Sequence, residues 1–204
     1  MASKVNITAE IRENMWPDAT GKIKPDWQLS ANFLNEARKE GYESQARFEL
    51  SGVVTKIIDE VNENGDPTNR VKVALAVVGY HGKVDVIELI AASSNAANYI
   101  KTEWKEGDTV NVNGALSVNH QTKVWFEEQG FGEPIKRTKT ESRKELIILG
   151  GSPGGLTEEY AYDANDIKNG LVQRQARAEE AKEKAKKGKA GAQTASKPTP
   201  FPNF

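Results

Sequence analysis

Three large aromatic side chains stand in a stretch of the chain that is otherwise polar, charged and glycine-bearing. Residues His120 to Ser142 read HQTKVWFEEQGFGEPIKRTKTES, and no apolar period of 2 or 3.6 surrounds the aromatic positions. Cations follow, and the run PIKRTKTESRK contains Glu141 as its single acid. Aromatic faces stack on planar groups such as nucleobases, and cations bind phosphate. The candidates for such chemistry are Trp125, Phe126, Phe131, Lys123, Lys136, Arg137, Lys139 and Arg143.

The chain as a whole has no excess of positive charge that would indicate a polyanionic partner. It has 204 residues and a formal net charge of -1, so charge has to be interpreted region by region. The segment IDEVNENGDPTN carries Asp59, Glu60, Glu63 and Asp66. Because these carboxylates repel phosphate, we expect this segment to lie outside any phosphate-binding groove.

Catalytic and metal chemistry find little support in the sequence. The absence of cysteine excludes disulfides and thiolate chemistry, and the two histidines, His81 and His120, leave little for a zinc site or an imidazole base. The glycine-rich GGSPGG at residues 150–155 lacks the Lys-Ser or Lys-Thr that follows in a phosphate-binding P-loop. We therefore expect a protein that is not an enzyme and needs no cofactor or metal.

The apolar segments are short. No stretch approaches 18 consecutive apolar residues, and the start MASKVNITAE lacks the apolar segment of a signal peptide. A soluble cytoplasmic protein is the expectation.

The elements that must position the candidates are mostly strands. Residues 70–80 alternate between apolar and polar side chains, which is typical of a strand with one face on a core. Gly52 interrupts a long β-branched run and indicates a bulge or bend. Ile100 and Trp104 lie one turn apart in a short helix that Gly107 can end. The expected order is a bent strand at 47–61, a hairpin of strands at 70–80 and 84–92, a helix within 96–107, a strand at 108–118, a long loop at 120–142 and a last strand at 143–150.

This order is that of an OB-fold, a five-stranded Greek-key barrel. The segment NAANYIKTEWKEGDTVNVNGALS resembles the part of single-stranded DNA-binding proteins where a short helix ends at a Lys-x-Gly-Asp-type turn. A strand carrying Val-x-Val-x-Gly-x-Leu follows there. KELIILGGSPG resembles the closing strand of the same family and its glycine-ended exit. The resemblance covers roughly residues 47 to 153 and implies a mainly β OB-fold barrel with a short helix between its third and fourth strands.

The resemblance also implies a function and a site. Members bind single-stranded DNA without sequence preference, in replication, recombination and repair. The loop His120–Ser142 then joins the fourth and fifth strands, one of the loops with which OB-folds hold oligonucleotides. Its aromatic residues become stacking platforms and its cations phosphate ligands. On the barrel face, Lys72 and Tyr80 are expected to extend the groove.

Other interpretations stay open at this point. In one alternative, Trp125 and Phe126 fold back onto the barrel and form a small satellite core. Trp27 and Trp104 are expected in the main core. In another, the aromatic loop grips a protein, and the chain is an interaction or scaffold module of a replisome or of phage assembly. Single-stranded RNA is a further alternative ligand, because stacking and phosphate contacts serve both nucleic acids.

The segment before the barrel, residues 1–46, is expected to pack on it. Val5, Ile7 and Ile11 have a strand period. Residues 27–41 are ambiguous, because Trp27 begins a strand-like alternation while Ser30 fits the N-cap of a helix that ends near Gly41. Bacterial single-stranded DNA-binding proteins begin almost directly with the barrel. The extension therefore indicates a phage-type or divergent member, located in the bacterial host cell if phage-encoded.

The OB-fold domain is expected to span residues 47–155. The segment after it is expected to be helical over residues 156–187. Asp163 is the expected N-cap, and a thin apolar stripe predicts docking by the first two turns alone, with Gly170 weakening the helix. From Lys182 the composition predicts disorder, with a disordered tail at 188–204. Family members end in an acidic run and a Pro-Phe tip that recruits replication proteins. Here no acid follows Glu183, and the apolar end consists of Pro200, Phe201, Pro202 and Phe204. Replication proteins that contact Phe201 and Phe204 are the partners expected of this tail.

Overall fold

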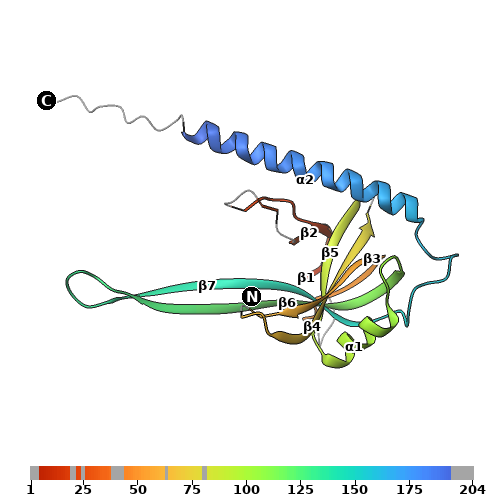
Figure 1. Ribbon diagram of the computed structural model, residues 1–204, viewed down its shortest axis with the longest axis horizontal. Coiled ribbons are helices and arrows are strands. Elements are labelled where there is room, and N and C mark those ends of the chain that lie inside the picture. The colour runs from red at the N-terminus through yellow and green to blue at the C-terminus, as the bar shows by residue number, and fades with distance from the viewer. Residues whose placement is uncertain are drawn as a thin grey trace. The chain divides into compact units, whose positions relative to one another are not determined.

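The computed structural model describes residues 5–18, 22–23, 26–37, 44–62, 64–79 and 82–193 (Figure 1). Packing divides the chain into two compact units. The first comprises Met1–Tyr42, Ala76–Ile87 and Tyr162–Phe204, and the second comprises Glu43–Leu75 and Glu88–Ala161.

Five strands close into a barrel, as expected of an OB-fold. The neighbour order is β3-β4-β5-β7-β6. β3 pairs antiparallel with β6, from Arg47 opposite Ala115 to Val53 opposite Thr109, and β5 runs parallel to β7 at Ile90 and Ile147. The strands are β3 (Arg47–Val61), β4 (Pro67–Val78), β5 (Val84–Ala91), β6 (Thr109–Glu127) and β7 (Ile135–Gly151).

The barrel core follows from the period-2 alternation of the strands. Val71, Val73 and Leu75 on β4 are fully buried, while Arg70 before them and Lys72 between them point outward. Other strands contribute in the same way. The largest fully buried side chains are those of Leu75, Ile87, Leu89, Leu146, Val54, Val71, Val73 and Val110.

Gly114 explains one part of the Val-x-Val-x-Gly-x-Leu strand in physical terms. A Cβ atom at this position would lie 2.2 Å from the carbonyl oxygen of Ile147 and 2.4 Å from the ring of Phe48. The pairing of β6 with β7 also shifts register between Asn113 and Gly114. The glycine therefore makes room for an aromatic side chain inside the barrel wall.

A short helix separates the third and fourth barrel strands, as predicted. α1 (Ser94–Glu103) begins at Ser93, whose side chain accepts a hydrogen bond from the Ala96 N–H at 3.2 Å. Ile100 and Trp104 are buried, and the Trp104 indole Nε1–H donates to the carbonyl of Ser152 at 3.1 Å. The prediction that Trp104 belongs to the core is confirmed.

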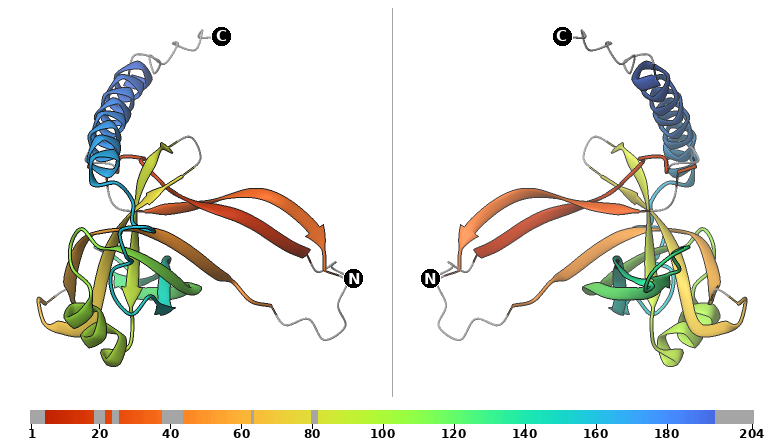
Figure 2. Two further views of the ribbon diagram at one scale, coloured as in Figure 1. Left: turned by 90° about the vertical axis from the view of Figure 1, so that its right-hand side faces the viewer. Right: turned by 90° about the vertical axis from the view of Figure 1, so that its left-hand side faces the viewer.

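The N-terminal segment forms a two-stranded ribbon. β1 (Val5–Glu13) pairs antiparallel with β2 (Trp27–Glu36), and Figure 2 shows the two strands side by side. This resolves the ambiguity of residues 27–36 in favour of the strand. Trp27 is buried, as expected, as is Ile11.

α2 (Ala164–Gln193) begins where the sequence indicates, because the Asp163 Oδ1 atom accepts from the N–H of Asn165 at 2.8 Å. Its contacts do not stop after two turns, so that prediction was wrong. Arg174 donates from Nε to Glu13 Oε2 of β1 at 2.7 Å, and Arg177 lies 3.4 Å from Asp85 of β5. Arginine side chains thus continue the docking face after the apolar stripe has ended.

Gly170 has a packing role in this helix. A Cβ atom there would lie 2.1 Å from Cγ2 of Val84, so only glycine lets the helix approach β5 this closely. The sequence interpretation treated this glycine as a weakness of the helix. The structure shows it at a buried contact.

The Gly170→Ala substitution is expected to destabilise the protein by about 1 to 3 kcal/mol, because overpacking outweighs the gain in helix propensity. Urea denaturation measures this loss. In the Val84→Ala background the same substitution has room and should be neutral or stabilising. Equal effects in both backgrounds would show that the contact does not determine the need for glycine.

The far end of α2 corrects a second prediction. The helix runs through Lys182 and past residue 187 to Gln193, where the composition had predicted disorder. Lys, Ala and Glu are strong helix formers, and they favour continuation of a helix that is already nucleated. Residues 194–204, including Phe201 and Phe204, lie outside the described residues.

Candidate nucleic-acid interface

The segment His120–Ser142 is a paired extension of two barrel strands. The register of β6 and β7 continues from His120 opposite Ser142 to Glu127 opposite Ile135 (Figure 1). The predicted loop was therefore wrong for all but residues 128–134. Apolar alternation is missing because no core covers either side of the described part of the ribbon, which backbone pairing and a few cross-strand side-chain contacts hold together. We refer to residues 120–142 as the arm.

The three aromatic side chains of the arm are accessible. Trp125 is 46% exposed, Phe126 66% and Phe131, in the turn, 95%. These values contradict the alternative in which Trp125 and Phe126 form a satellite core. Exposed aromatic faces of this size are available for stacking.

The register of the arm sorts the predicted residues onto its two sides. Residues opposite each other in a ladder point to the same side, and alternate residues along a strand do so too. Trp125 is opposite Arg137 on one side, which we call the Trp125 face, and Phe126 is opposite Lys136 on the other, the Phe126 face. The Trp125 face carries Lys123, Trp125, Arg137, Lys139 and, at the base of the arm, Arg143.

The Trp125 face concentrates cations beside its aromatic ring. Lys123 lies directly opposite Lys139, two residues along each strand from Trp125 and Arg137. Both lysines are cations of the kind that contact phosphate. Arg137 is held by Glu127 at 2.7 Å, with both side chains about half exposed.

The Phe126 face has a different composition. It includes the exposed apolar side chains Val118, Val124 and Phe126, together with Lys136 and Lys144. Two polar side-chain contacts cross between the strands on this face. Thr122 Oγ1 lies 3.3 Å from Thr140 Oγ1, and His120 Nδ1 lies 2.8 Å from Ser142 Oγ. Among the described arm side chains, no carboxylate lies on this face.

The barrel-face candidates behave differently from those on the arm. Lys72 lies 3.8 Å from Glu60 and 3.5 Å from Glu88, and Arg143 contacts both Glu60 and Glu145. Tyr80 lies outside the described residues. Sequence reasoning missed the role of Glu60, which it had assigned to an excluded acidic segment. The carboxylate is buried and ion-paired, and no local pattern around it signals this.

Comparison with protein-family models assigns a family to the chain that carries this arm and barrel. The YorF family model matches residues 1–184. The chain belongs to the YorF family. A comparison with curated protein sequences gave no significant match.

Several solved structures resemble the YorF chain at low identity. The mitochondrial single-stranded DNA-binding protein Rim1 of S. cerevisiae has 11% identity and a TM-score of 0.36, covering 54% of this chain and 95% of Rim1. The wild-type single-stranded DNA-binding protein from Thermus aquaticus has 17% identity and a TM-score of 0.46, covering 79% and 63% of the two chains. The Plasmodium falciparum protein SSB, in a complex with ssDNA, has 18% identity and a TM-score of 0.34, covering 55% and 96%.

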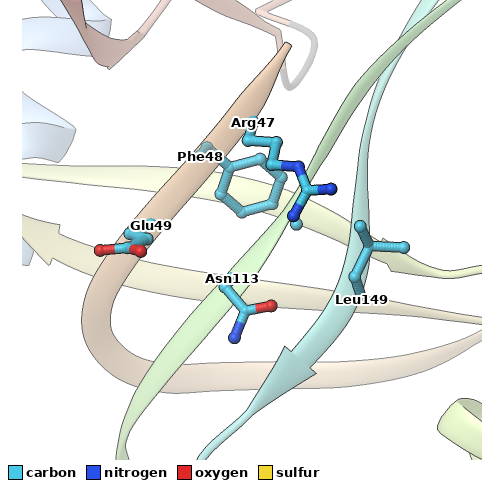
Figure 3. A pocket seen from close by; sticks show the side chains of 6 residues that line it. Arg47, Phe48, Glu49, Asn113 and Leu149 are labelled. Atoms are coloured by element: carbon cyan, nitrogen blue, oxygen red, sulfur yellow. The ribbon is translucent and has the colours of Figure 1, made fainter. Parts of the chain in front are cut away.

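The YorF barrel also has an open recess of about 420 Å³ on its wall, where β3, β6 and β7 meet. Figure 3 shows the side chains that line it, which combine a cation, a carboxylate, an amide and exposed apolar surface. Sequence reasoning gave no indication of this recess, because its residues come together only through strand pairing. They are Arg47, Phe48, Glu49, Asn113, Gly114 and Leu149.

Metal-binding clusters and membrane-spanning helices are both missing from the described part of the chain. No cluster of three or more His, Asp or Glu side chains there is arranged to hold a metal ion. None of the helices within those residues is both long and apolar enough to cross a membrane.

Proposed function

We propose that this YorF-family protein binds single-stranded DNA without sequence preference and serves DNA replication, recombination or repair. The observation that carries the proposal is the Trp125 face of the arm. There, an exposed indole lies directly opposite an arginine, and an opposed pair of lysines lies two residues away along the same two strands. An aromatic platform beside a row of cations is the arrangement with which proteins bind single strands independently of sequence.

The geometry favours a single strand over a duplex. Stacking on Trp125 requires an unstacked base, which a single strand offers and an intact duplex withholds. Lys123, Arg137 and Lys139 then contact the backbone on either side of that base, and such contacts carry no sequence information. Nothing in these contacts selects the sugar, so RNA is an outcome that the test must separate.

The Phe126 face supports a second candidate function. Val118, Val124 and Phe126 form an exposed apolar strip with cations beside it. Apolar strips of this kind mark protein contacts. A scaffold that binds a protein through the arm therefore competes with the first proposal.

Titration of intrinsic fluorescence tests the proposal. We expect tight binding of oligo-dT at low salt and weaker binding of duplex DNA, with oligo-U as the RNA arm. Phosphate contacts from Lys123, Arg137 and Lys139 predict a slope of log K against log salt of roughly -2, which is about a 15-fold loss between 50 and 200 mM. Binding that ignores salt, or equal affinity for duplex, contradicts the proposal and favours the scaffold.

A further inference from the structure

Two arginines and two glutamates form a closed ring of ion pairs on the barrel surface. Arg70 Nε lies 3.2 Å from Glu60 Oε2, and Arg70 Nη2 donates to Glu145 Oε2 at 2.9 Å. Arg143 Nε lies 2.7 Å from Glu145 Oε1, and Arg143 Nη2 donates to Glu60 Oε1. Each carboxylate thus bridges both guanidiniums, and each guanidinium bridges both carboxylates. We call this the Arg–Glu ring.

The two glutamates of the ring are buried, whereas Arg143 is exposed to solvent. Glu60 and Glu145 are each 6% exposed, whereas the side chain of Arg143 is 57% exposed. Burial raises the pKa of Glu60, but the hydrogen bond from Arg143 and the charges of Arg70, Arg143 and Lys72 outweigh it, so that its pKa lies below the usual value. Glu60 is therefore anionic at neutral pH.

The ring also lies where the Trp125 face reaches the barrel. Arg143 stands opposite Asn119 in the ladder, on the same side of β7 as Lys139. A strand bound along the Trp125 face arrives next at Arg143. There it meets cations that Glu60 and Glu145 already neutralise.

Arg143 is the corner that can leave the ring without leaving a buried charge unpaired. In its absence Glu60 keeps Arg70 at 3.2 Å and Lys72 at 3.8 Å, and Glu145 keeps Arg70 at 2.9 Å. Leaving a buried carboxylate without a cationic partner costs several kcal/mol. Departure of Arg143 does not incur this cost, because Arg70 still pairs with both carboxylates. The geometry of Nε and Nη2, which now serves two carboxylates, equally suits the oxygens of a phosphate.

We propose that Arg143 is an exchangeable phosphate ligand and that Glu60 limits the affinity for nucleic acid by competing for it. A backbone phosphate of a strand on the Trp125 face takes the guanidinium of Arg143 from Glu60 and Glu145. This inference rests on the proposed function, and it identifies Glu60 as the residue that limits the affinity for nucleic acid.

The test compares two neutralising substitutions of adjacent residues on β3. Glu60→Gln weakens the ring, whereas Asp59→Asn removes the same charge from an exposed residue that pairs with Lys101 at 2.7 Å. With oligo-dT as the probe, Glu60→Gln is expected to raise affinity about three- to tenfold with little change in the salt slope, because Arg143 already contacts phosphate in the wild-type complex. Asp59→Asn should leave the affinity unchanged.

The Arg143→Ala background shows whether the gain passes through Arg143. In the proposed arrangement Glu60→Gln no longer raises affinity in this background. Arg143 adds a fourth phosphate contact to those of Lys123, Arg137 and Lys139, so Arg143→Ala alone flattens the wild-type salt slope by about 0.7. This second readout can be used even if Glu60→Gln fails to fold. An undiminished gain in this background, or a gain shared by Asp59→Asn, shows a general charge effect and overturns the inference. Wild-type protein that does not bind oligo-dT overturns the proposed function itself, and this inference with it.

Discussion

Replacement of residues 121–141 by an Asn-Gly turn is expected to lower the affinity for oligo-dT more than 100-fold and to leave the barrel folded. The change removes the stacking of Trp125, worth about 1 to 3 kcal/mol, and the phosphate contacts of Lys123, Arg137 and Lys139. Together these exceed the roughly 2.7 kcal/mol that a 100-fold change requires. Fluorescence anisotropy of labelled oligo-dT measures the loss.

The barrel should survive this excision because the arm contributes nothing to its core. His120 and Ser142 remain opposite each other, and an Asn-Gly pair closes a two-residue hairpin with the twist that the strands need. The buried side chains of Val112 on β6 and Leu146 on β7 are both retained in the shortened protein. A melting temperature lowered by many degrees would show that the arm belongs to the cooperative core. Retained oligo-dT affinity would move the binding site away from the arm.

The second large effect separates two tryptophans. Trp104→Ala is expected to destabilise the protein by about 3 to 5 kcal/mol, because the ring is buried and its Nε1–H donates to Ser152. Trp125→Ala is expected to cost about 1 to 3 kcal/mol of binding to oligo-dT and little stability, because the exposed ring leaves no cavity. Urea denaturation and oligo-dT titration, run on both variants, measure the two free energies.

Two controls make this comparison specific. Trp125→Phe keeps an aromatic face and should keep most of the affinity, while Phe126→Ala removes a ring from the opposite side of the same strand. If the Trp125 face alone binds the strand, Phe126→Ala changes the affinity less than twofold. A loss as large as that of Trp125→Ala would show that both faces bind nucleic acid. A large loss of stability in Trp125→Ala would restore the satellite-core interpretation.

The predicted part of the fold is the part in which strands face a core. Val71, Val73 and Leu75 alternate with outward residues because burial selects one side, so the barrel strands and their order could be anticipated. The arm could not, because its strands face solvent on both sides and burial imposes no period on them. Its aromatics were recognised as candidates, but their division between two faces depends on a register that no local pattern encodes.

The ion pairs were beyond sequence reasoning for a related reason. Glu60, Arg70 and Glu145 lie on three different strands, and any charged residue in a strand has many possible partners until the strands are aligned. The docking of α2 through Arg174 and Arg177 has the same origin, since Glu13 and Asp85 come from distant segments. Gly170 looked unfavourable from helix propensity alone, and only the neighbouring Val84 gives it a reason.

The continuity of β6 and β7 has a mechanical consequence. A single ladder runs from Val112 opposite Gly151, in the barrel wall, to Glu127 opposite Ile135 near the tip, with one register shift at Asn113 and Gly114. The ribbon therefore behaves as a lever built into the seam that closes the barrel, and not as a flap on a flexible hinge. Tension on its tip reaches the wall through rows of backbone hydrogen bonds. The irregular step at Gly114, where Phe48 fills the space of a side chain, is the point at which that load meets the core.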